Sequence, residues 1–125
     1  MDVKFHPDGS IVAGCMADGT VKLWDARCDA LLQHYAAHSS AAHHIDFHPS
    51  GDFLVSSGQD AAVRIWDLRA GTPLFTLRGH EGAVRGASFS KDGRHFATGG
   101  AVDGVVMVWQ ADLAAAHSSK TTSPR

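Results

Sequence analysis

The feature that most constrains the fold of this chain is a repeat with a period of about 42 residues. The segment Phe-His-Pro-Asp-Gly at 5–9 recurs as Phe-His-Pro-Ser-Gly at 47–51 and as Phe-Ser-Lys-Asp-Gly at 89–93. Tryptophans keep nearly the same spacing. Such a period predicts a row of similar units, each of which buries its apolar faces only against its neighbours.

Each unit is predicted to form four short strands. The runs of the central unit alternate between apolar and polar residues, are rich in β-branched and aromatic side chains, and are separated by turn sequences such as Pro-Ser-Gly. The predicted strands are 43–47, 53–56, 62–66 and 74–77 in the central unit, and 2–5, 10–13, 20–24 and 31–35 in the first. After Trp109 the pattern stops, so no outer strand is expected for the third unit.

The repeat resembles the WD40 family over about residues 1–110. The resemblance rests on the period, on the Trp-Asp pairs at 24–25 and 66–67, and on Gly-His at 79–80. It implies an all-β fold, a partial WD40 β-propeller of about three four-stranded blades. Propellers usually have four to eight blades, so a fragment of a larger propeller is expected. The resemblance to the centriolar WD-repeat proteins, given below, implies that this propeller has seven blades. The expected divisions are 1–35 (an incomplete first blade), 36–77 (the second), 78–110 (the third, without its outer strand) and 111–125 (a flexible tail).

The resemblance also implies a structural hydrogen-bonded tetrad in each blade, because a buried indole N–H needs an acceptor. Gly14 stands where Ser56 stands one repeat later, so the first tetrad is expected to be partial. The implied tetrads are His38, Ser56, Asp60 and Trp66 in the second blade, His80, Thr98, Asp103 and Trp109 in the third, and Asp18 with Trp24 alone in the first.

The sequence lacks the patterns that carry chemistry. It shows no nucleophile with a neighbouring base and no glycine motif that would cradle a phosphate, so we predict no enzyme, no cofactor and no small-molecule substrate. Nine histidines suggest a metal. However, His43 and His44 would point to opposite faces of a strand, and we predict no metal site. The two cysteines, at 15 and 28, have no paired spacing, which favours the reducing cytoplasm.

The charge distribution gives a weak indication of a partner. A net charge of −2 points to neither nucleic acid nor a membrane. Residues 1–60 carry three Lys or Arg against eight Asp, whereas 61–125 carry eight against five Asp or Glu. Within the basic half, Arg78, Arg85 and Arg94 are candidate contacts for an acidic protein surface. Solvated loops are the alternative interpretation of these arginines.

Two further positions are candidates for partner binding. His43 and Arg85 are equivalent in the repeat, and Gln59 precedes a tetrad aspartate, so all three are expected near one face of the propeller. Loops on a rigid scaffold can meet a partner at low ordering cost. The alternative, that these side chains are only solvated, stays open.

The sequence Trp-Asp-x-Arg occurs twice, ending at Arg27 and Arg69. It resembles the motif by which some WD-repeat substrate receptors dock onto the adaptor of cullin-RING ubiquitin ligases. This resemblance implies an alternative function as a substrate receptor. Arginine at this position is also common in ordinary repeats.

A finer resemblance is to the centriolar WD-repeat proteins named for the proteome of the centriole. It rests on Val-Lys-Phe-His-Pro at 3–7, on Leu-Leu-Gln-His-Tyr at 31–35 and on Thr-Leu-Arg-Gly-His at 76–80. It implies a non-enzymatic scaffold that supports microtubule triplets or doublets in centrioles, basal bodies or the ciliary axoneme. Tubulin, microtubules or centriolar proteins are the implied partners, and cytoplasm and cytoskeleton the expected localisation.

Overall fold

The computed structural model describes residues 2–28, 30–111 and 122–124. These residues form twelve strands and no helix, and the strands make three antiparallel sheets of four strands each. The first sheet contains β1 (Asp2–Phe5), β2 (Ile11–Cys15), β3 (Thr20–Asp25) and β4 (Leu31–Ala36). The second contains β5 (Ala42–Phe47), β6 (Phe53–Gly58), β7 (Val63–Asp67) and β8 (Thr72–Leu77), and the third β9 (Val84–Phe89), β10 (His95–Gly100), β11 (Val106–Ala111) and β12 (Thr122–Pro124). The predicted all-β fold with three blades is confirmed.

The outer strand of the third blade corrects the expectation drawn from the sequence. No outer strand was predicted, yet β12 pairs antiparallel with β11, with Pro124 opposite Trp109. The prediction was wrong because an edge strand needs backbone hydrogen bonds on one side only and can therefore be very short. A strand of three residues is too short to show an alternation of apolar and polar residues in the sequence. Proline is tolerated there because an edge strand has N–H groups that need no partner in the sheet. The other residues of the predicted flexible tail, 112–121 and 125, lie outside the described residues.

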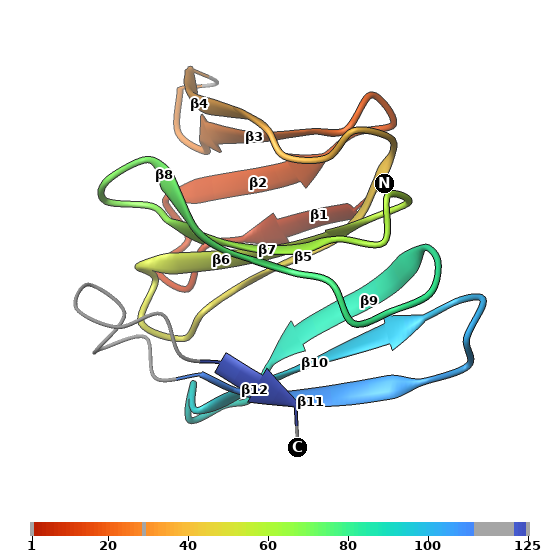
Figure 1. Cartoon of the computed structure of the whole chain (residues 1–125). Coiled ribbons are helices and arrows are strands. Elements are labelled where there is room, and N and C mark those ends of the chain that lie inside the picture. The colour runs from red at the N-terminus through yellow and green to blue at the C-terminus, as the bar shows by residue number, and fades with distance from the viewer. Residues whose placement is uncertain (1, 29, 112–121, 125) are drawn as a thin grey trace.

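The three sheets lie one on another, and Figure 1 shows the first at the top and the third at the bottom. One face of each of the second and third blades carries the tetrad tryptophan and packs against the preceding blade. We call this the tetrad face, and we call the other the forward face. Each forward face in the interior of the stack packs on the tetrad face of the next blade.

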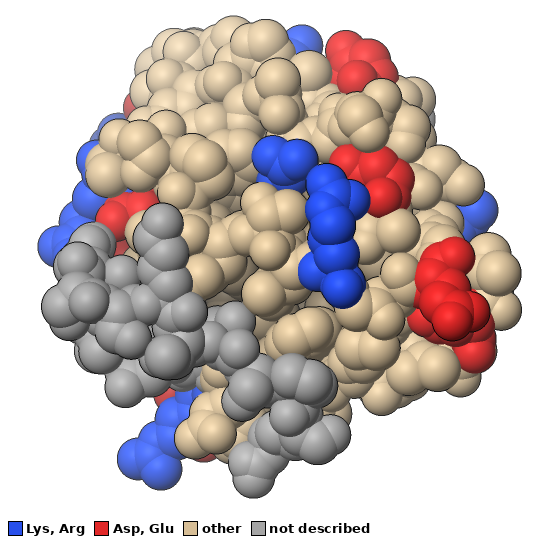
Figure 2. All heavy atoms as spheres, viewed as in Figure 1, with Lys and Arg blue, Asp and Glu red and all other residues tan. Residues whose placement is uncertain are grey.

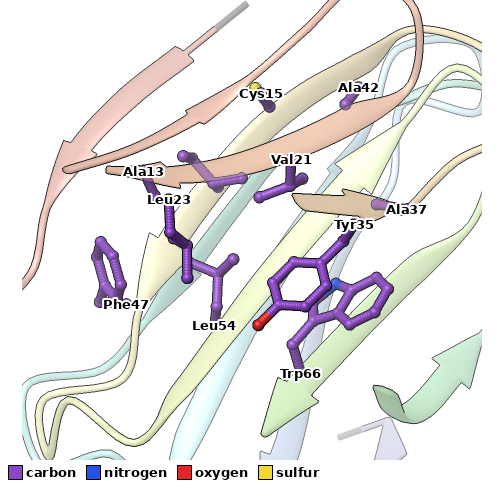
Figure 3. Packing of buried hydrophobic residues seen from close by; sticks show 11 residues of the cluster. Ala13, Cys15, Val21, Leu23, Tyr35, Ala37, Ala42, Phe47, Leu54 and Trp66 are labelled. Carbon is purple, nitrogen blue, oxygen red and sulfur yellow. The ribbon is translucent and has the colours of Figure 1, made fainter. Parts of the chain in front are cut away.

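The interface between the first and second blades is an apolar layer (Figure 3). Tyr35 stacks on Trp66 with ring centroids 4.5 Å apart and planes inclined by 18°. Burial of apolar area of this kind is the main stabilising term for such a stack. The buried residues of this layer are Ala13, Cys15, Val21, Leu23, Tyr35, Ala37, Ala42, Ile45, Phe47, Leu54 and Trp66.

The second interface is also an apolar layer, but its tetrad tryptophan stacks within its own blade. Phe96 of β10 lies opposite Trp109 of β11, with ring centroids 6.0 Å apart and planes inclined by 9°. The buried residues of this layer are Phe53, Val55, Val63, Ile65, Phe75, Val84, Ala87, Phe96 and Trp109.

The two ends of the blades differ. One end holds the turns at 59–62 and 101–105, and β5 and β9 each carry a β-bulge there, with His43 and Arg85 as the extra residues. We call this the bulge end. The opposite end holds the turns at 6–10, 48–52 and 90–94, and we call it the clasp end because two histidines there bond to the next blade.

Candidate functional site

The second blade contains a closed chain of hydrogen bonds. The indole Nε1–H of Trp66 donates to Ser56 Oγ at 3.1 Å, Ser56 Oγ lies 3.0 Å from His38 Nε2, and His38 Nδ1 lies 2.9 Å from Asp60 Oδ1. Every group is satisfied when His38 is neutral and carries its proton on Nδ1, because Ser56 then donates to Nε2. The four residues are those that the resemblance to the WD40 family implied.

The third blade has the same arrangement with threonine in place of serine. Trp109 Nε1–H donates to Thr98 Oγ1 at 2.9 Å, and that oxygen lies 2.8 Å from His80 Nε2. His80 Nδ1 lies 3.0 Å from Asp103 Oδ2. Both central hydroxyl groups are fully buried, so no substrate can reach them, and the tetrads act as structural links between strands.

The tetrad aspartates also close their turns. Asp60 accepts hydrogen bonds from the amides of Ser39 and Ala62, and Asp103 does so from Glu81 and Val105. Burial on its own would raise the pKa of Asp60, but the Ser39 amide and the nearby His38 lower it below its ordinary value. The turn is therefore held by an ionised carboxylate at neutral pH.

The first blade lacks this network. Asp18 accepts from the amide and the hydroxyl of Thr20, which is a turn contact. Trp24 lies on the tetrad face, which no described blade covers, where it lines an open hollow of about 410 Å³ with Phe5 and Val12. A side chain at Gly14 would meet Trp24 at 3.1 Å. The partial first tetrad thus leaves an open apolar face.

Histidines at the clasp end join neighbouring blades, a role that the sequence did not reveal. His6 Nε2 lies 2.8 Å from the carbonyl oxygen of Gly51, and His48 Nε2 lies 3.0 Å from that of Gly93. The sequence showed both histidines in matching turns, but a recurring residue does not indicate which residue it contacts in the next unit. The sequence signal for these contacts was a histidine in one unit followed, 45 positions later, by a glycine in the next unit.

The bulge end brings together two of the candidate partner-binding residues. His43 Nε2 lies 2.8 Å from Gln59 Oε1, and Arg85 is exposed at the equivalent bulge of the third blade. Val102 and Val105 are exposed in the turn that follows β10. The amide of Ala101 ties this turn to the residues before β9 by donating to the Ala83 carbonyl at 3.0 Å. The surface thus combines an exposed arginine with apolar side chains, and the exposed Glu81 lies at the same end.

A comparison with protein-family models places all three blades in one family. The model of the WD domain, G-beta repeat, matches residues 1–25, 29–67 and 71–110. The chain belongs to the WD40 family. A search of curated protein sequences finds no match to the chain. WD40 domains are protein-interaction scaffolds that are typically not catalytic, and the tetrads and clasps of this WD40 chain are the rigid frame of such a scaffold.

Arg94 lies apart from the other two arginines that were predicted to form one basic patch. Arg85 lies where β9 pairs with the last residue of β10, at the bulge end, whereas Arg94 lies in the turn at the clasp end. Arg78 follows β8 and is also at the bulge end, because Leu77 pairs with Val63, but β8 is an outer strand and β9 an innermost one. The patch was inferred from charge counted along the chain, but successive turns of a meander alternate between the two ends. In Figure 2, basic side chains form a column over the middle of the visible face, with acidic side chains beside it.

The two Trp-Asp-x-Arg arginines lie in equivalent turns at the clasp end. Arg27 is exposed, and its Nε lies 3.2 Å from Asp25 Oδ1. Arg69 is also exposed, and its Nε lies 3.8 Å from Asp52 Oδ1. Exposed pairs of this kind stabilise little. Both guanidinium groups are accessible to a partner.

Other classes of site were searched for among the described residues. No group of three His, Cys, Asp or Glu side chains there is placed to hold a metal ion. The same residues include no helix that is long and apolar enough to cross a membrane.

Proposed function

We propose that this WD40 chain is a non-catalytic scaffold that binds an acidic protein surface at its bulge end. The observation that carries the proposal is the exposed Arg85 on a β-bulge, close to the exposed apolar turn of Val102 and Val105. A bulge turns a side chain away from the regular ladder and is frequent where a sheet meets a ligand. Arginine is one of the residue types that are enriched in binding hot spots.

The partner that we propose is tubulin, in centrioles, basal bodies or ciliary microtubules. Two arguments support it: the exposed Arg85 at the bulge end can pair with a carboxylate of an acidic surface, and segments of all three repeats resemble the centriolar WD-repeat proteins. The proposed role is to support triplet or doublet microtubules within the cytoplasmic cytoskeleton. Because the binding residues lie on strands and short turns of a rigid stack, little ordering entropy opposes binding.

Co-sedimentation with microtubules tests the proposal. We expect Arg85→Glu to weaken binding roughly tenfold, which corresponds to about 1.4 kcal/mol, and added salt to weaken the binding of the unmodified chain. Arg94→Glu is the matched control, since it makes the same charge change at the opposite end. Arg78→Glu tests whether the rim of the second blade contributes.

The two reversals separate a specific contact from general attraction. Equal losses for Arg85→Glu and Arg94→Glu would mean that only net charge matters, and undiminished binding of both variants would rule out the bulge end as the contact. Failure of the unmodified chain to co-sediment would remove tubulin as the partner. Tagging of the endogenous protein then tests the location: signal at centrioles or axonemes is expected, and a diffuse signal argues against the microtubule role.

A second candidate function is a substrate receptor of a cullin-RING ubiquitin ligase. The observation that favours it is the equivalent exposure of Arg27 and Arg69 at the clasp end. If this function is correct, Arg27→Ala combined with Arg69→Ala abolishes co-purification of the ligase adaptor. The bulge-end variant Arg85→Glu would leave the adaptor bound. The microtubule function predicts a loss of binding for Arg85→Glu, whereas the ligase function predicts a loss of binding for the variant that combines Arg27→Ala with Arg69→Ala.

A further inference from the structure

The outer strands of the three blades differ at one repeating position. Each outer strand places one residue opposite the repeating tryptophan of its blade: Leu31 opposite Trp24 in β4, Pro73 opposite Trp66 in β8 and Pro124 opposite Trp109 in β12. Proline has no backbone N–H, so the sheet takes no hydrogen bond from this position in the second and third blades. In the first blade the same position carries a leucine, whose N–H therefore points away from the sheet.

The edge of β4 lacks the features that usually keep a sheet from pairing with another strand. Proline and charged side chains are two such features. The sequence of β4, Leu-Leu-Gln-His-Tyr-Ala, contains neither proline nor a lysine, arginine or acidic residue. A bulge next to Leu31 or Pro73 is common to β4 and β8, so it does not distinguish the two strands. Among the outer strands that the structure describes, β4 is thus the one without proline.

The rim position of β4 makes this edge accessible (Figure 1). Leu31 is 54% exposed and Leu32 is 48% exposed. Pro73, which matches Leu31, is also exposed, although the second blade is covered on both faces. Exposure at this position is therefore a property of the rim and does not depend on whether a blade flanks the strand.

A second residue of β4 also directs its backbone groups outward. The amide of Asp25, at the end of β3, donates to the Ala30 carbonyl at 2.8 Å. Residues of an antiparallel strand bond alternately to the strands on its two sides, so Leu23, two positions earlier in β3, also bonds towards β4. Its partner there is Gln33. The N–H and C=O of His34, the next residue in β4, then point away from β3.

We propose that two copies of this chain pair their β4 edges antiparallel about a twofold axis, which joins two four-stranded blades into one sheet of eight strands. An antiparallel edge is its own complement, because the axis sets the N–H groups of each strand against the C=O groups of the other. The edge has no charged side chain, so no like-charge repulsion opposes the approach of an identical strand.

The partner is a second copy because pairing needs a second unblocked edge. Proline occupies the outer edges of β8 and β12. The inner strands do not offer such an edge, since β1 lies against β5 and β5 against β9. Within the described part of the chain, the edge that matches β4 is therefore β4 of another molecule.

Sedimentation equilibrium of the 125-residue chain tests the pairing. The expected mass rises with concentration towards twice the 13.2 kDa of one copy. A mass that stays at 13.2 kDa at all concentrations overturns the proposal.

Leu31→Pro is the decisive variant, because it copies the residue that the other two blades carry at this position. We expect it to fold, which circular dichroism checks. The twofold axis removes two hydrogen bonds at once, so the dimer dissociation constant should rise by about thirtyfold. Leu31→Ala is the matched control, since it shortens the side chain but keeps the N–H, and it should retain most of the affinity. An unchanged constant for Leu31→Pro, or equal losses for the two variants, contradicts strand pairing.

Hydrogen exchange gives a second readout that needs no substitution. The amides of Leu31 and His34 should exchange quickly in dilute solution and more slowly at concentrations where the dimer forms. A doubled mass without added protection at these amides would mean that the copies meet through another surface, and it would overturn the proposal. The inference does not rest on the microtubule proposal, because Arg85 lies at the bulge end and β4 at the rim.

Discussion

His48 in the second blade lies with its Nε2 3.0 Å from the carbonyl oxygen of Gly93 in the third. The amide of Ser50 donates to the other ring nitrogen at 3.1 Å, which leaves the proton on Nε2 for Gly93. The ring also makes edge contacts with Phe53 and Phe89, at centroid distances of 5.6 and 5.0 Å. Gly93 has φ of +72°, and a Cβ there would lie 2.4 Å from the ring. The clasp therefore needs both residue types.

Replacement of this histidine should loosen the second and third blades. We expect His48→Ala to lower the free energy of unfolding by about 2–4 kcal/mol, since it removes a hydrogen bond and leaves a cavity beside two phenylalanines. Urea denaturation followed by tryptophan fluorescence measures the change. His34→Ala, at an exposed position on β4, is the control and should change stability by less than about 0.5 kcal/mol. Equal effects of the two substitutions would show that the clasp contributes nothing.

The hydroxyl group of Thr98 should contribute more to the stability of the chain than the methyl group of the same residue. Thr98→Val keeps the shape but leaves Trp109 Nε1–H and His80 Nε2 without partners in a buried site. We expect a loss of about 2–4 kcal/mol from two unsatisfied groups. Thr98→Ser keeps the hydroxyl and should lose only about 1 kcal/mol. Thermal or urea unfolding of both variants compares them, and a larger loss for serine than for valine would contradict the role assigned to the hydroxyl.

The repeat predicted what recurs within one blade. The strands and turns follow from residues that keep the same spacing, and the grouping of His38 with Trp66 follows from the resemblance to the WD40 family. Contacts between blades were harder to infer. The His48 to Gly93 bond joins two units, and identical spacings in all units do not say which neighbour is reached.

Two other features left no pattern in the sequence. The edge strand β12 has three residues, which is too short to show an alternation of apolar and polar residues in the sequence. Arg85 and Arg94 lie nine positions apart and seemed to form one patch, but the intervening strand carries them to opposite ends of the sheet. Distance along a β-meander is a poor guide to distance in space whenever a single strand separates two residues.

Ala61 occupies a backbone conformation that favours glycine. Its φ is +67°, and the equivalent positions are Gly19 at +90° and Gly104 at +65°. An alanine in the left-handed region costs about 1–2 kcal/mol relative to glycine. After the added freedom of glycine in the unfolded chain is subtracted, we expect Ala61→Gly to stabilise the chain by about 0.5–1 kcal/mol.

A neighbouring alanine provides the matched comparison. Ala62 is fully buried and has no positive φ, so Ala62→Gly should destabilise the chain. Urea unfolding measures both changes, and the prediction is that they have opposite signs. Destabilisation by Ala61→Gly would mean that the turn does not require this conformation.

The tetrad of the second blade should make folding sensitive to mild acid. Burial lowers the pKa of His38 below its ordinary value of about 6.5, although the nearby Asp60 acts in the opposite direction, and Arg64 and His43 lower it further. The unfolded chain therefore binds the proton more readily than the folded chain. The contribution of His38 is complete above about pH 6.5 and is lost progressively as the pH falls below that value.

A second loss follows at lower pH, because the pKa values of Asp60 and Asp103 are also lowered in the folded chain. Backbone hydrogen bonds from Val105 and Glu81 are the main cause at Asp103. The stability that these carboxylates supply is present above about pH 4 and disappears below it.

Free energies of unfolding from urea titrations between pH 7.5 and about 3.5 give the test. In His38→Gln the slope between pH 7 and 5 should become smaller, while the loss below about pH 4 remains. Had Asp60 raised the pKa of His38 above that of the unfolded state, mild acid would stabilise the chain. A rise in stability between pH 7 and 5 would therefore show that ion pairing, and not burial, dominates in this tetrad.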